Sequence, residues 1–172
     1  MKTHPITLPA FGSIIPNQGG YFAAILRGPV IDGIEQPPYA LIVSDAAVGE
    51  VQSQWGQYGK DISGTSSRTD GKANTDAMAT AECAAALKVR SMTIDGHCDW
   101  YLPALGELNS AAANVPELFS TDGYYWTSTQ TSRNDAFVQG FEYGDSYSYW
   151  YIKGNERRAR ACRRISLDLL TA

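Results

Sequence analysis

Short apolar runs bounded by turn residues dominate the first part of the chain. The segments 19–28 (GGYFAAILRG) and 37–45 (PPYALIVSD) each begin and end at Gly, Pro or Asp, a pattern typical of strands. With GPVIDGIEQPP as their connection, they predict a β-hairpin. The following stretch 48–75 is polar and rich in glycine, with isolated rings at Trp55 and Tyr58. We expect a long loop there, held in place by those two rings.

Helical spacing replaces this pattern in the middle of the chain. The segment NTDAMATAECAAALKV brings Ala, Met and Leu to helical spacing behind a cap at Asn74 or Thr75, which predicts an Ala-rich helix. The segment DGHCDWYLPALGELNSAAANV predicts a turn, a short extended piece and a second helix, with Pro103 near its first turn and Glu107 after it.

The last third of the chain returns to strand-like patterns. GYYWTSTQ, DAFVQGFEY, SYSYWYIK and RRARACRRI all follow Pro116, and GNE at 154–156 is typical of a hairpin turn between the last two. The order of strands, two helices and strands indicates an α+β fold. We predict a single domain over 1–172, with a strand-and-loop part at 1–73 and a helix-helix-sheet part at 74–172.

Composition and charge restrict the classes of function. At 172 residues with 44% hydrophobic content, the chain is long enough for one well-buried core. Its 14 basic and 18 acidic residues give a net charge of -4, which argues against a general polyanion binder, so no nucleic-acid partner is expected. The sequence has no apolar run of membrane-spanning length and no apolar secretion segment at its start, so we expect neither membrane insertion nor a signal peptide.

Candidate catalytic groups are sparse. The only histidines are His4 and His97, which leaves a Ser or Cys nucleophile short of bases. Asp95, His97, Cys98 and Asp99 are close in sequence, but a metal site ordinarily needs a second ligand group, and we favour a polar turn. We therefore expect no metal and no cofactor. The carboxylates are scattered, so a glycosidase pair stays open.

Three cysteines, Cys83, Cys98 and Cys162, stand at unrelated spacings. An odd number without a repeated spacing argues against a disulfide framework. This usage agrees with synthesis in a reducing cytoplasm.

Five arginines fall between Arg157 and Arg164. Strand alternation divides this segment between two faces, so part of the charge would lie on a packed face. We predict structural roles, with guanidinium groups such as that of Arg160 bonded to loop carbonyls, over contacts with nucleic acid or ligand. One face would carry Ala159, Ala161, Arg163 and Ile165, and the other Arg158, Arg160, Cys162 and Arg164.

Two segments carry a family resemblance. DWYLPALGELN (99–109) and YYWTSTQ, AFVQGFEYG and RRARACRRI within 124–165 resemble a bacterial and phage family marked by Trp-x-Leu-Pro, a helix with Glu-Leu, then Trp-Ser-Ser/Thr and a closing Arg-x-Arg strand. That family resembles the C-type lectin-like fold, which formylglycine-generating enzymes and the variable proteins of diversity-generating retroelements also use. The resemblance implies two helices packed on a small, mainly antiparallel twisted sheet with long loops, and it covers at least residues 74–165.

Two activities known from this fold find little support in the residues. Calcium-dependent sugar binding in C-type lectins uses Glu-Pro-Asn or Gln-Pro-Asp with Trp-Asn-Asp, and neither motif stands in the C-terminal half; the EQPP at Glu35 lies in the wrong part of the chain. Formylglycine generation requires a pair of reactive cysteines, whereas Cys83 falls on the expected Ala-rich helix and is interpreted as a small buried thiol. We therefore expect no enzymatic activity.

The retroelement resemblance accounts for an unusual stretch at 143–151, YGDSYSYWY. In such systems AAY codons diversify through adenine changes, which yield Tyr, Asp and Ser among others. Because Trp cannot arise this way, Trp150 is expected to be a fixed scaffold residue, along with Trp100, Trp126 and Arg160. The alternating tyrosines would share one display face, and 130–135 would form a second rim. The expected ligand-binding residues are Tyr143, Asp145, Ser146, Tyr147, Ser148, Tyr149, Tyr151, Arg133 and Asn134.

A mixture of Tyr, Ser, Gly and Asp suits recognition, because Tyr supplies rigid contact area and the small residues supply hydrogen bonds. We therefore expect a receptor-binding or host-recognition protein of a phage, prophage or bacterium, resembling a retroelement variable protein or a tail fibre. Its partner would be a protein or carbohydrate ligand on a cell surface. The protein itself would act on a virion or cell surface, as a virion component or a homo-oligomer. Two alternatives stay open: a structural tail protein with an invariant interface, and an enzyme with a cleft beside Trp55.

Overall fold

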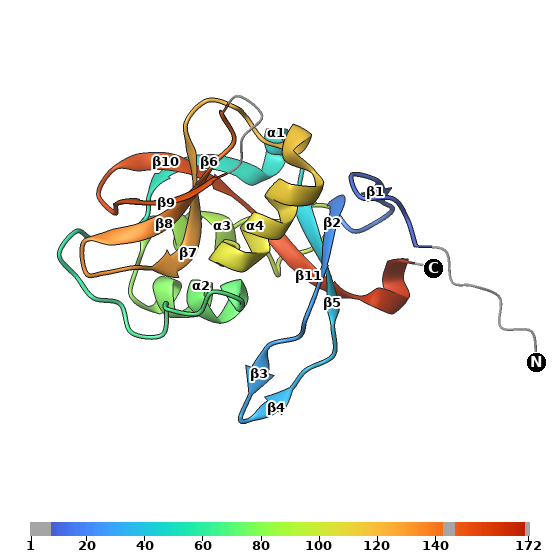
Figure 1. Ribbon diagram of the computed structural model, residues 1–172, viewed down its shortest axis with the longest axis horizontal. Coiled ribbons are helices and arrows are strands. Elements are labelled where there is room, and N and C mark those ends of the chain that lie inside the picture. Colours follow the sequence, from blue (N-terminus) through green and yellow to red (C-terminus); the bar gives the residue numbers. More distant parts are fainter. Residues whose placement is uncertain (1–7, 143–146, 171–172) are drawn as a thin grey trace, which may run out of the picture.

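The computed structural model of the protein describes residues 8–142 and 147–170, except for the side chains of Tyr147 and Ser148. Its elements follow in the order shown in Figure 1. They are β1 (Ile14–Ile15), β2 (Gly20–Leu26), β3 (Val30–Ile31), β4 (Ile34–Glu35), β5 (Tyr39–Ser44), α1 (Ala46–Gly49), β6 (Glu50–Gln54), α2 (Gly71–Thr80), α3 (Ala84–Arg90), α4 (Leu105–Asn114), η1 (Pro116–Leu118), β7 (Tyr124–Gln130), β8 (Asp135–Gly140), β9 (Tyr147–Ile152), β10 (Glu156–Arg160), β11 (Cys162–Ser166) and η3 (Leu167–Leu170).

The strands form two larger sheets and a small hairpin. One sheet has the order β1-β2-β5-β11, the other has the order β6-β10-β7-β8-β9, and β3 pairs with β4. All of these pairs are antiparallel except β10 with β7. The expected α+β class is confirmed, as is the hairpin of β2 and β5, whose connection extends into the β3–β4 arm (Figure 1).

Both faces of β7, the middle strand of the five-stranded sheet, are buried. On β7, Tyr125 packs in one apolar cluster with Leu108 and Ala111 of α4, while Trp126 packs in another with residues of α2 and α3. Successive side chains of a strand point to opposite faces, so the sheet lies between α4 on one side and α2 with α3 on the other. This explains why the middle of β7 is buried throughout.

The chain passes from one sheet to the other at Ala161. The Ala161 N–H donates to the Gly49 carbonyl at 2.8 Å, and the Ala161 carbonyl accepts from the Ser44 N–H at 3.0 Å. β10 before it belongs to the five-stranded sheet and β11 after it to the four-stranded sheet. A Cβ at Gly49 would collide with the Ser44 side chain, so glycine is required at this junction.

The predicted hairpin between the last strands is wrong. β9 pairs with β8, whereas β10 lies between β6 and β7, on the other side of the sheet. β10 forms five register pairs with β6, from Glu156 opposite Gln54 to Arg160 opposite Glu50. The sequence of β6, EVQSQ, is polar and was interpreted as part of a loop. For this reason the strand that pairs with β10 was not predicted.

The Ala-rich helix differs from its prediction at its start and in its middle. Asp70 caps α2 by accepting from the Ala73 N–H at 3.1 Å, so the helix begins before the expected cap at Asn74 or Thr75. It stops at Thr80, and Glu82 takes a positive φ of 58° before α3 begins. Because β6 and α2 take up both ends of the predicted loop 48–75, the loop covers only 55–70. Tyr58 is 63% exposed, so its ring does not hold the loop in place as predicted.

The arginines of β10 and β11 are used structurally, as predicted. Arg158 and Arg160 both pair with Glu50, at 3.0 and 2.6 Å. The buried Arg160 also donates to the Ser44 carbonyl at 3.1 Å. Arg163 pairs with an Asp99 carboxylate oxygen at 2.8 Å and donates to the Gln18 carbonyl at 3.3 Å. These groups join loops to the sheets.

Three of the four tryptophans are fully buried, with their indole N–H groups satisfied. Trp55 donates to the Thr127 carbonyl at 2.7 Å, Trp100 to the His97 carbonyl at 3.0 Å, and Trp126 to the Ser53 carbonyl at 2.9 Å. Trp150, expected as a fixed scaffold residue, is 52% exposed and so differs from the other three. It lies on β9, an edge strand of the sheet.

A pair of matched substitutions tests this division. Trp126→Ala should lower the free energy of unfolding by about 3–5 kcal/mol, because it empties a buried ring site and breaks a hydrogen bond. Trp150→Ala should cost less than about 1 kcal/mol, since half of its ring already faces water. Urea denaturation followed by circular dichroism measures both free energies of unfolding. Equal decreases in the two variants would contradict the assignment of Trp126 to the core and Trp150 to the surface.

Candidate functional site

The structure describes only some of the residues that the sequence predicts to bind a ligand. Tyr143, Asp145 and Ser146 lie outside the described residues, as do the side chains of Tyr147 and Ser148. The backbone of β9 is described, and it pairs along its length with β8. The structure therefore places Tyr149, Tyr151, Arg133 and Asn134 of the predicted set.

Tyr149 and Trp150 form an exposed aromatic pair. Their rings are stacked, with centroids 5.4 Å apart and planes 10° from parallel, and Tyr149 is 49% exposed. Trp150 stands opposite the half-buried Phe137 of β8, and the Arg68 guanidinium lies 5.2 Å from the centre of the Phe137 ring. Ile152 adds an aliphatic side chain that is 44% exposed.

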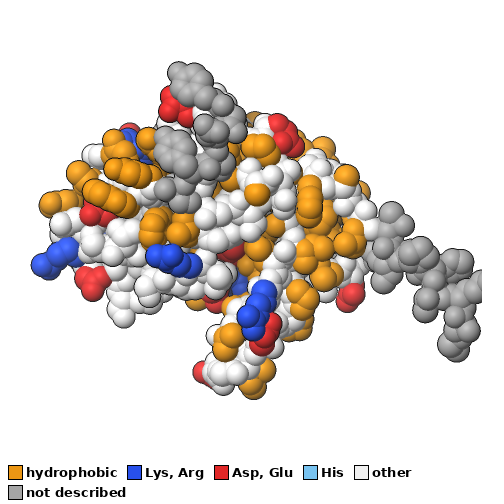
Figure 2. Space-filling view, in the orientation of Figure 1, with side chains coloured by type: hydrophobic (Ala, Val, Ile, Leu, Met, Phe, Trp, Pro, Cys, Tyr) orange, Lys and Arg blue, Asp and Glu red, His pale blue; other side chains and the backbone are white. Residues whose placement is uncertain are grey.

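We call Phe137, Tyr149, Trp150 and Ile152, with Arg68 beside them, the aromatic patch. Figure 2 shows hydrophobic side chains gathered on the left of the molecule, over the part of the sheet that β8 and β9 form in Figure 1. Among the described strands, β9 pairs with β8 alone. The patch therefore combines exposed rings with a strand edge whose outer backbone groups have no strand partner in the described residues.

Tyr151 is less exposed than Tyr149. The prediction that the alternating tyrosines of β9 all lie on an exposed face is therefore wrong for Tyr151. It is half-buried against the larger core cluster, 5.7 Å from Tyr124 between ring centroids, and the Arg157 guanidinium lies 3.9 Å from its ring centre. In register it stands opposite the buried Ala136. The tyrosine face of β9 thus turns toward the core at this end of the strand.

The second predicted rim, the turn between β7 and β8, does lie beside β9. The Arg133 Nε–H donates to the Gly59 carbonyl at 3.1 Å, and the Asn134 carbonyl accepts from the Lys153 N–H at 3.0 Å. Asp135, at the start of β8, pairs with Ile152 at the end of β9. The structure therefore brings Arg133 and Asn134 next to the Ile152 end of the aromatic patch.

Lys153 anchors this region and was missed from sequence. Its ammonium group is fully buried and donates to the Lys60 carbonyl at 3.0 Å, to Gln130 Oε1 at 2.5 Å and to the Arg133 carbonyl at 3.4 Å. It lies 4.6 Å from the Trp55 ring centre. Burial lowers the pKa of Lys153 to about 8, because a charged amine loses hydration. A lysine before Gly-Asn resembles an ordinary surface turn, so the sequence pattern gave no indication of its burial.

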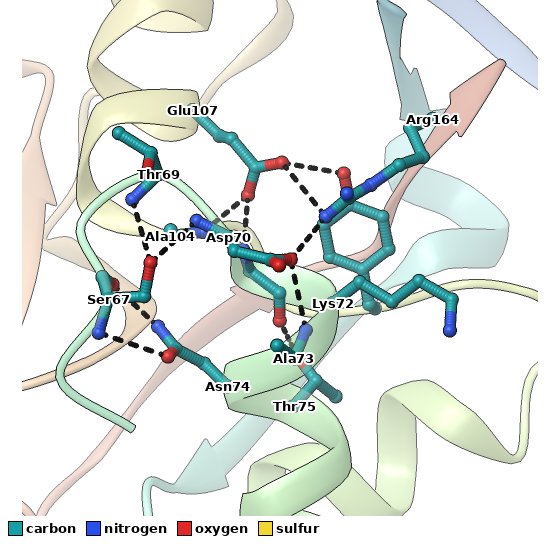
Figure 3. Close-up of polar contacts among 12 residues, drawn as sticks. Ser67, Thr69, Asp70, Lys72, Ala73, Asn74, Thr75, Ala104, Glu107 and Arg164 are labelled. Atoms are coloured by element: carbon teal, nitrogen blue, oxygen red, sulfur yellow. Dashed lines mark hydrogen bonds and ion pairs between the residues drawn. The ribbon is translucent and has the colours of Figure 1, made fainter. Parts of the chain in front are cut away.

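A second feature is a cavity of about 680 Å³ at the base of the β3–β4 arm. Leu26, Pro29 and Val30 line it from the arm, and residues of α2 and α4 line it from the other side. This cavity differs from the cleft that the enzyme alternative would place beside Trp55, because Trp55 is not among its lining residues. Polar side chains cluster at the floor of this cavity around Glu107 (Figure 3).

Glu107 is buried and its carboxylate accepts four hydrogen bonds. Oε1 accepts from the hydroxyls of Tyr39 at 2.6 Å and Tyr101 at 2.7 Å, and Oε2 accepts from the backbone N–H groups of Ala104 at 2.8 Å and Gly71 at 3.1 Å. Burial raises the pKa of Glu107 above its ordinary value, while these bonds work in the opposite direction. Because the acceptor sites are filled from within the protein, we interpret the carboxylate as a structural junction of α2, α4 and β5.

The polar turn at 95–99 is also occupied by internal contacts. Asp95 accepts from the Gly19 N–H at 3.2 Å, a His97 ring nitrogen lies 2.8 Å from the Asn17 carbonyl, and Asp99 pairs with Arg163. Within residues 8–142 and 147–170, no group of three or more His, Cys, Asp or Glu side chains is placed to hold a metal ion. In the same residues, no helix has the length and apolar character needed to cross a bilayer.

The Glu107 junction can be tested with a matched pair of variants. Glu107→Gln should lower the free energy of unfolding by about 1–3 kcal/mol, because the single amide oxygen can accept from only one of the two pairs of donors that the carboxylate now serves. Glu117→Gln, at an exposed position of η1, should change it by less than about 0.5 kcal/mol. Thermal and urea denaturation measure the stability of both variants. If Glu107→Gln unfolds with the same free energy as the wild type, Glu107 is not a structural junction.

Comparisons with known proteins give a structural likeness but no family. No family model matches the chain, and no curated protein matches it. Among solved structures, a fimbrial protein from Bacteroides ovatus is similar, with a TM-score of 0.54 and 12% sequence identity. The match covers 88% of this chain and 44% of that protein, so this chain spans less than half of its length. At this identity the likeness establishes a shared fold and nothing further.

Proposed function

We propose that this protein is a non-catalytic binding module that recognises a protein ligand at a cell surface through the aromatic patch. One observation carries the proposal: Tyr149 and Trp150 are stacked on each other and about half exposed on an edge strand. Exposed aromatic residues of this kind are enriched among the residues that dominate binding energy at interfaces.

The strand edge favours a protein over a carbohydrate. An extended segment of a partner can add to an open strand through main-chain hydrogen bonds, while side-chain contacts on the strand give specificity. The patch offers rings and Ile152 for such contacts, and Arg68 adds a charged group beside Phe137. Resemblance to a fimbrial protein agrees with a place on a cell or virion surface, although that likeness concerns fold alone.

The finer assignments belong to this proposal as well. The C-type lectin-like fold is supported by the Trp-Tyr-Leu-Pro run at 100–103 and by the Arg-x-Arg run in β10, together with the α+β arrangement. Diversification by a retroelement is supported by the Tyr, Ser and Asp content of 143–151. With Trp150 exposed, the invariant ring itself would lie on the binding surface, stacked on the diversified Tyr149.

Binding to cells tests the central part of the proposal. Labelled protein should bind a responsive strain within a panel of bacterial cells, and the double variant Tyr149→Ala with Trp150→Ala should weaken binding at least about tenfold, since two hot-spot rings are lost. Phe11→Ala is the matched control, because Phe11 is 48% exposed and shortly precedes β1 in the sequence. Figure 1 shows β1 and β9 on different sides of the molecule. Equal binding by the double variant and wild type would contradict the proposal.

Treatment of the cells identifies the ligand class. Protease treatment should abolish the patch-dependent binding and periodate oxidation should leave it unchanged. The reverse result would replace the protein ligand by a carbohydrate.

The diversification hypothesis has a separate genetic test. The DNA flanking the gene should contain a reverse transcriptase and a near-copy of the segment encoding 124–165, with mismatches confined to adenines. Sequencing that region decides the point. A region with neither feature would make the aromatic patch an invariant binding face and would leave the cell-binding test unaffected.

A further inference from the structure

An amine and a carboxamide meet inside the protein beneath the turn between β7 and β8. Lys153 Nζ lies 2.5 Å from Gln130 Oε1. The main chain holds both residues: the Gln130 N–H donates to the Thr65 carbonyl at 2.8 Å, and the Lys153 carbonyl accepts from the Trp55 N–H at 3.0 Å. The hydrogen bond between Nζ and Oε1 holds the amine beside the carboxamide, so a reaction between the amine nitrogen and the adjacent carbon Cδ would be intramolecular.

The surroundings polarise the Gln130 carboxamide. Its Oε1 also accepts from the Ile62 backbone N–H at 2.9 Å, so a second donor can stabilise negative charge that develops on this oxygen. Its Nε2 donates to Asp61 Oδ1. A carboxylate therefore lies against the nitrogen that would leave, where it can carry a proton.

Burial raises the fraction of Lys153 side chains that carry a neutral amine, the form that can react. It is fully buried beside the Trp55 ring, and its hydrogen-bond acceptors among the described residues are two carbonyls and an amide oxygen, with no carboxylate. Asp61, Asp135 and Cys83 act to raise its pKa, but burial outweighs them and sets it at about 8. About one amine in ten is then neutral at pH 7.

We propose that Lys153 and Gln130 form an intramolecular isopeptide bond. The neutral amine attacks the Gln130 carboxamide carbon, so the Nζ–Cδ bond forms and the Cδ–Nε2 bond breaks. The attacking nitrogen releases one proton to solvent, and the exposed Asp61, which accepts from Nε2, delivers a proton drawn from solvent to that leaving nitrogen, which departs as ammonia. The exchange of one amide for another is balanced and needs neither oxidant nor reductant.

The bond would close a covalent loop around the binding region. It joins the last residue of β7 to the residue after β9, and so encloses β8, β9 and the turn with Arg133. A cross-link limits the conformations of the unfolded chain and stabilises the segment it encloses. It would also hold the strand that carries Tyr149 and Trp150 when a bound ligand is pulled.

Mass spectrometry of the full-length purified protein tests the proposal. The denatured chain should be lighter than its sequence mass by about 17 Da, the mass of ammonia. A peptide digest should then contain one branched peptide with both Lys153 and Gln130, which distinguishes the link from loss of ammonia elsewhere. A full-mass chain that yields the two residues in separate linear peptides would overturn the proposal.

Variants assign the roles. Lys153→Met should retain the full mass, whereas Lys60→Met, at an exposed neighbouring lysine, should still show the loss. Because Lys153→Met removes a buried group and can impair folding, Asp61→Asn, at an exposed position, serves as the second variant. In a time course after cell-free synthesis it should give at least about tenfold less linked product, as expected for loss of a proton carrier. Equal linkage in Asp61→Asn would overturn the role of Asp61.

Discussion

Burial of both faces of β7 is the constraint on which the rest of the structure depends. Tyr125 and Trp126 are consecutive, fully buried and committed to different apolar clusters, so helices must cover the sheet on both sides. α2 and α3 supply one cover and α4 the other (Figure 1). The five-stranded sheet ends at β9, which pairs with β8 alone among the described strands. On this edge strand Tyr149 and Trp150 are about half exposed.

Buried polar groups fix the irregular segments against this frame. Glu107 ties the beginnings of α2 and α4 together through backbone donors, and Arg160 joins Glu50 to the Ser44 carbonyl near the passage between sheets. Lys153 performs the same task for the loop at 55–70 and for the turn carrying Arg133. An unpaired buried polar group is costly, so each of these side chains specifies a single arrangement of the loops around it. The candidate binding surface therefore rests on a fixed base.

Sequence patterns predicted the parts of the fold that are locally apolar. β2 and β5 were found from their short apolar runs, and α4 from Pro103 and the Glu-Leu pattern after it, because those signals lie within a few residues. The pattern could not reveal β6, whose EVQSQ becomes a strand only by pairing with β10. For the site, the turn at Arg133 lies beside Ile152, at one end of β9. Trp150, expected as a fixed scaffold residue, is exposed, and strand alternation does not show which strand lies at an edge. Lys153 was missed because its burial comes from Trp55 and Gln130, both distant in sequence.

Iodide quenching of tryptophan fluorescence tests most directly the claim that β9 offers its aromatic residues to solvent while the other tryptophans are enclosed. Of the four tryptophans, only Trp150 is exposed in the described structure. Wild type should therefore show one quenchable component, and Trp150→Phe should lose that component while keeping the blue-shifted emission of buried rings. A quenchable component that persists in Trp150→Phe, or its absence from wild type, would contradict the account.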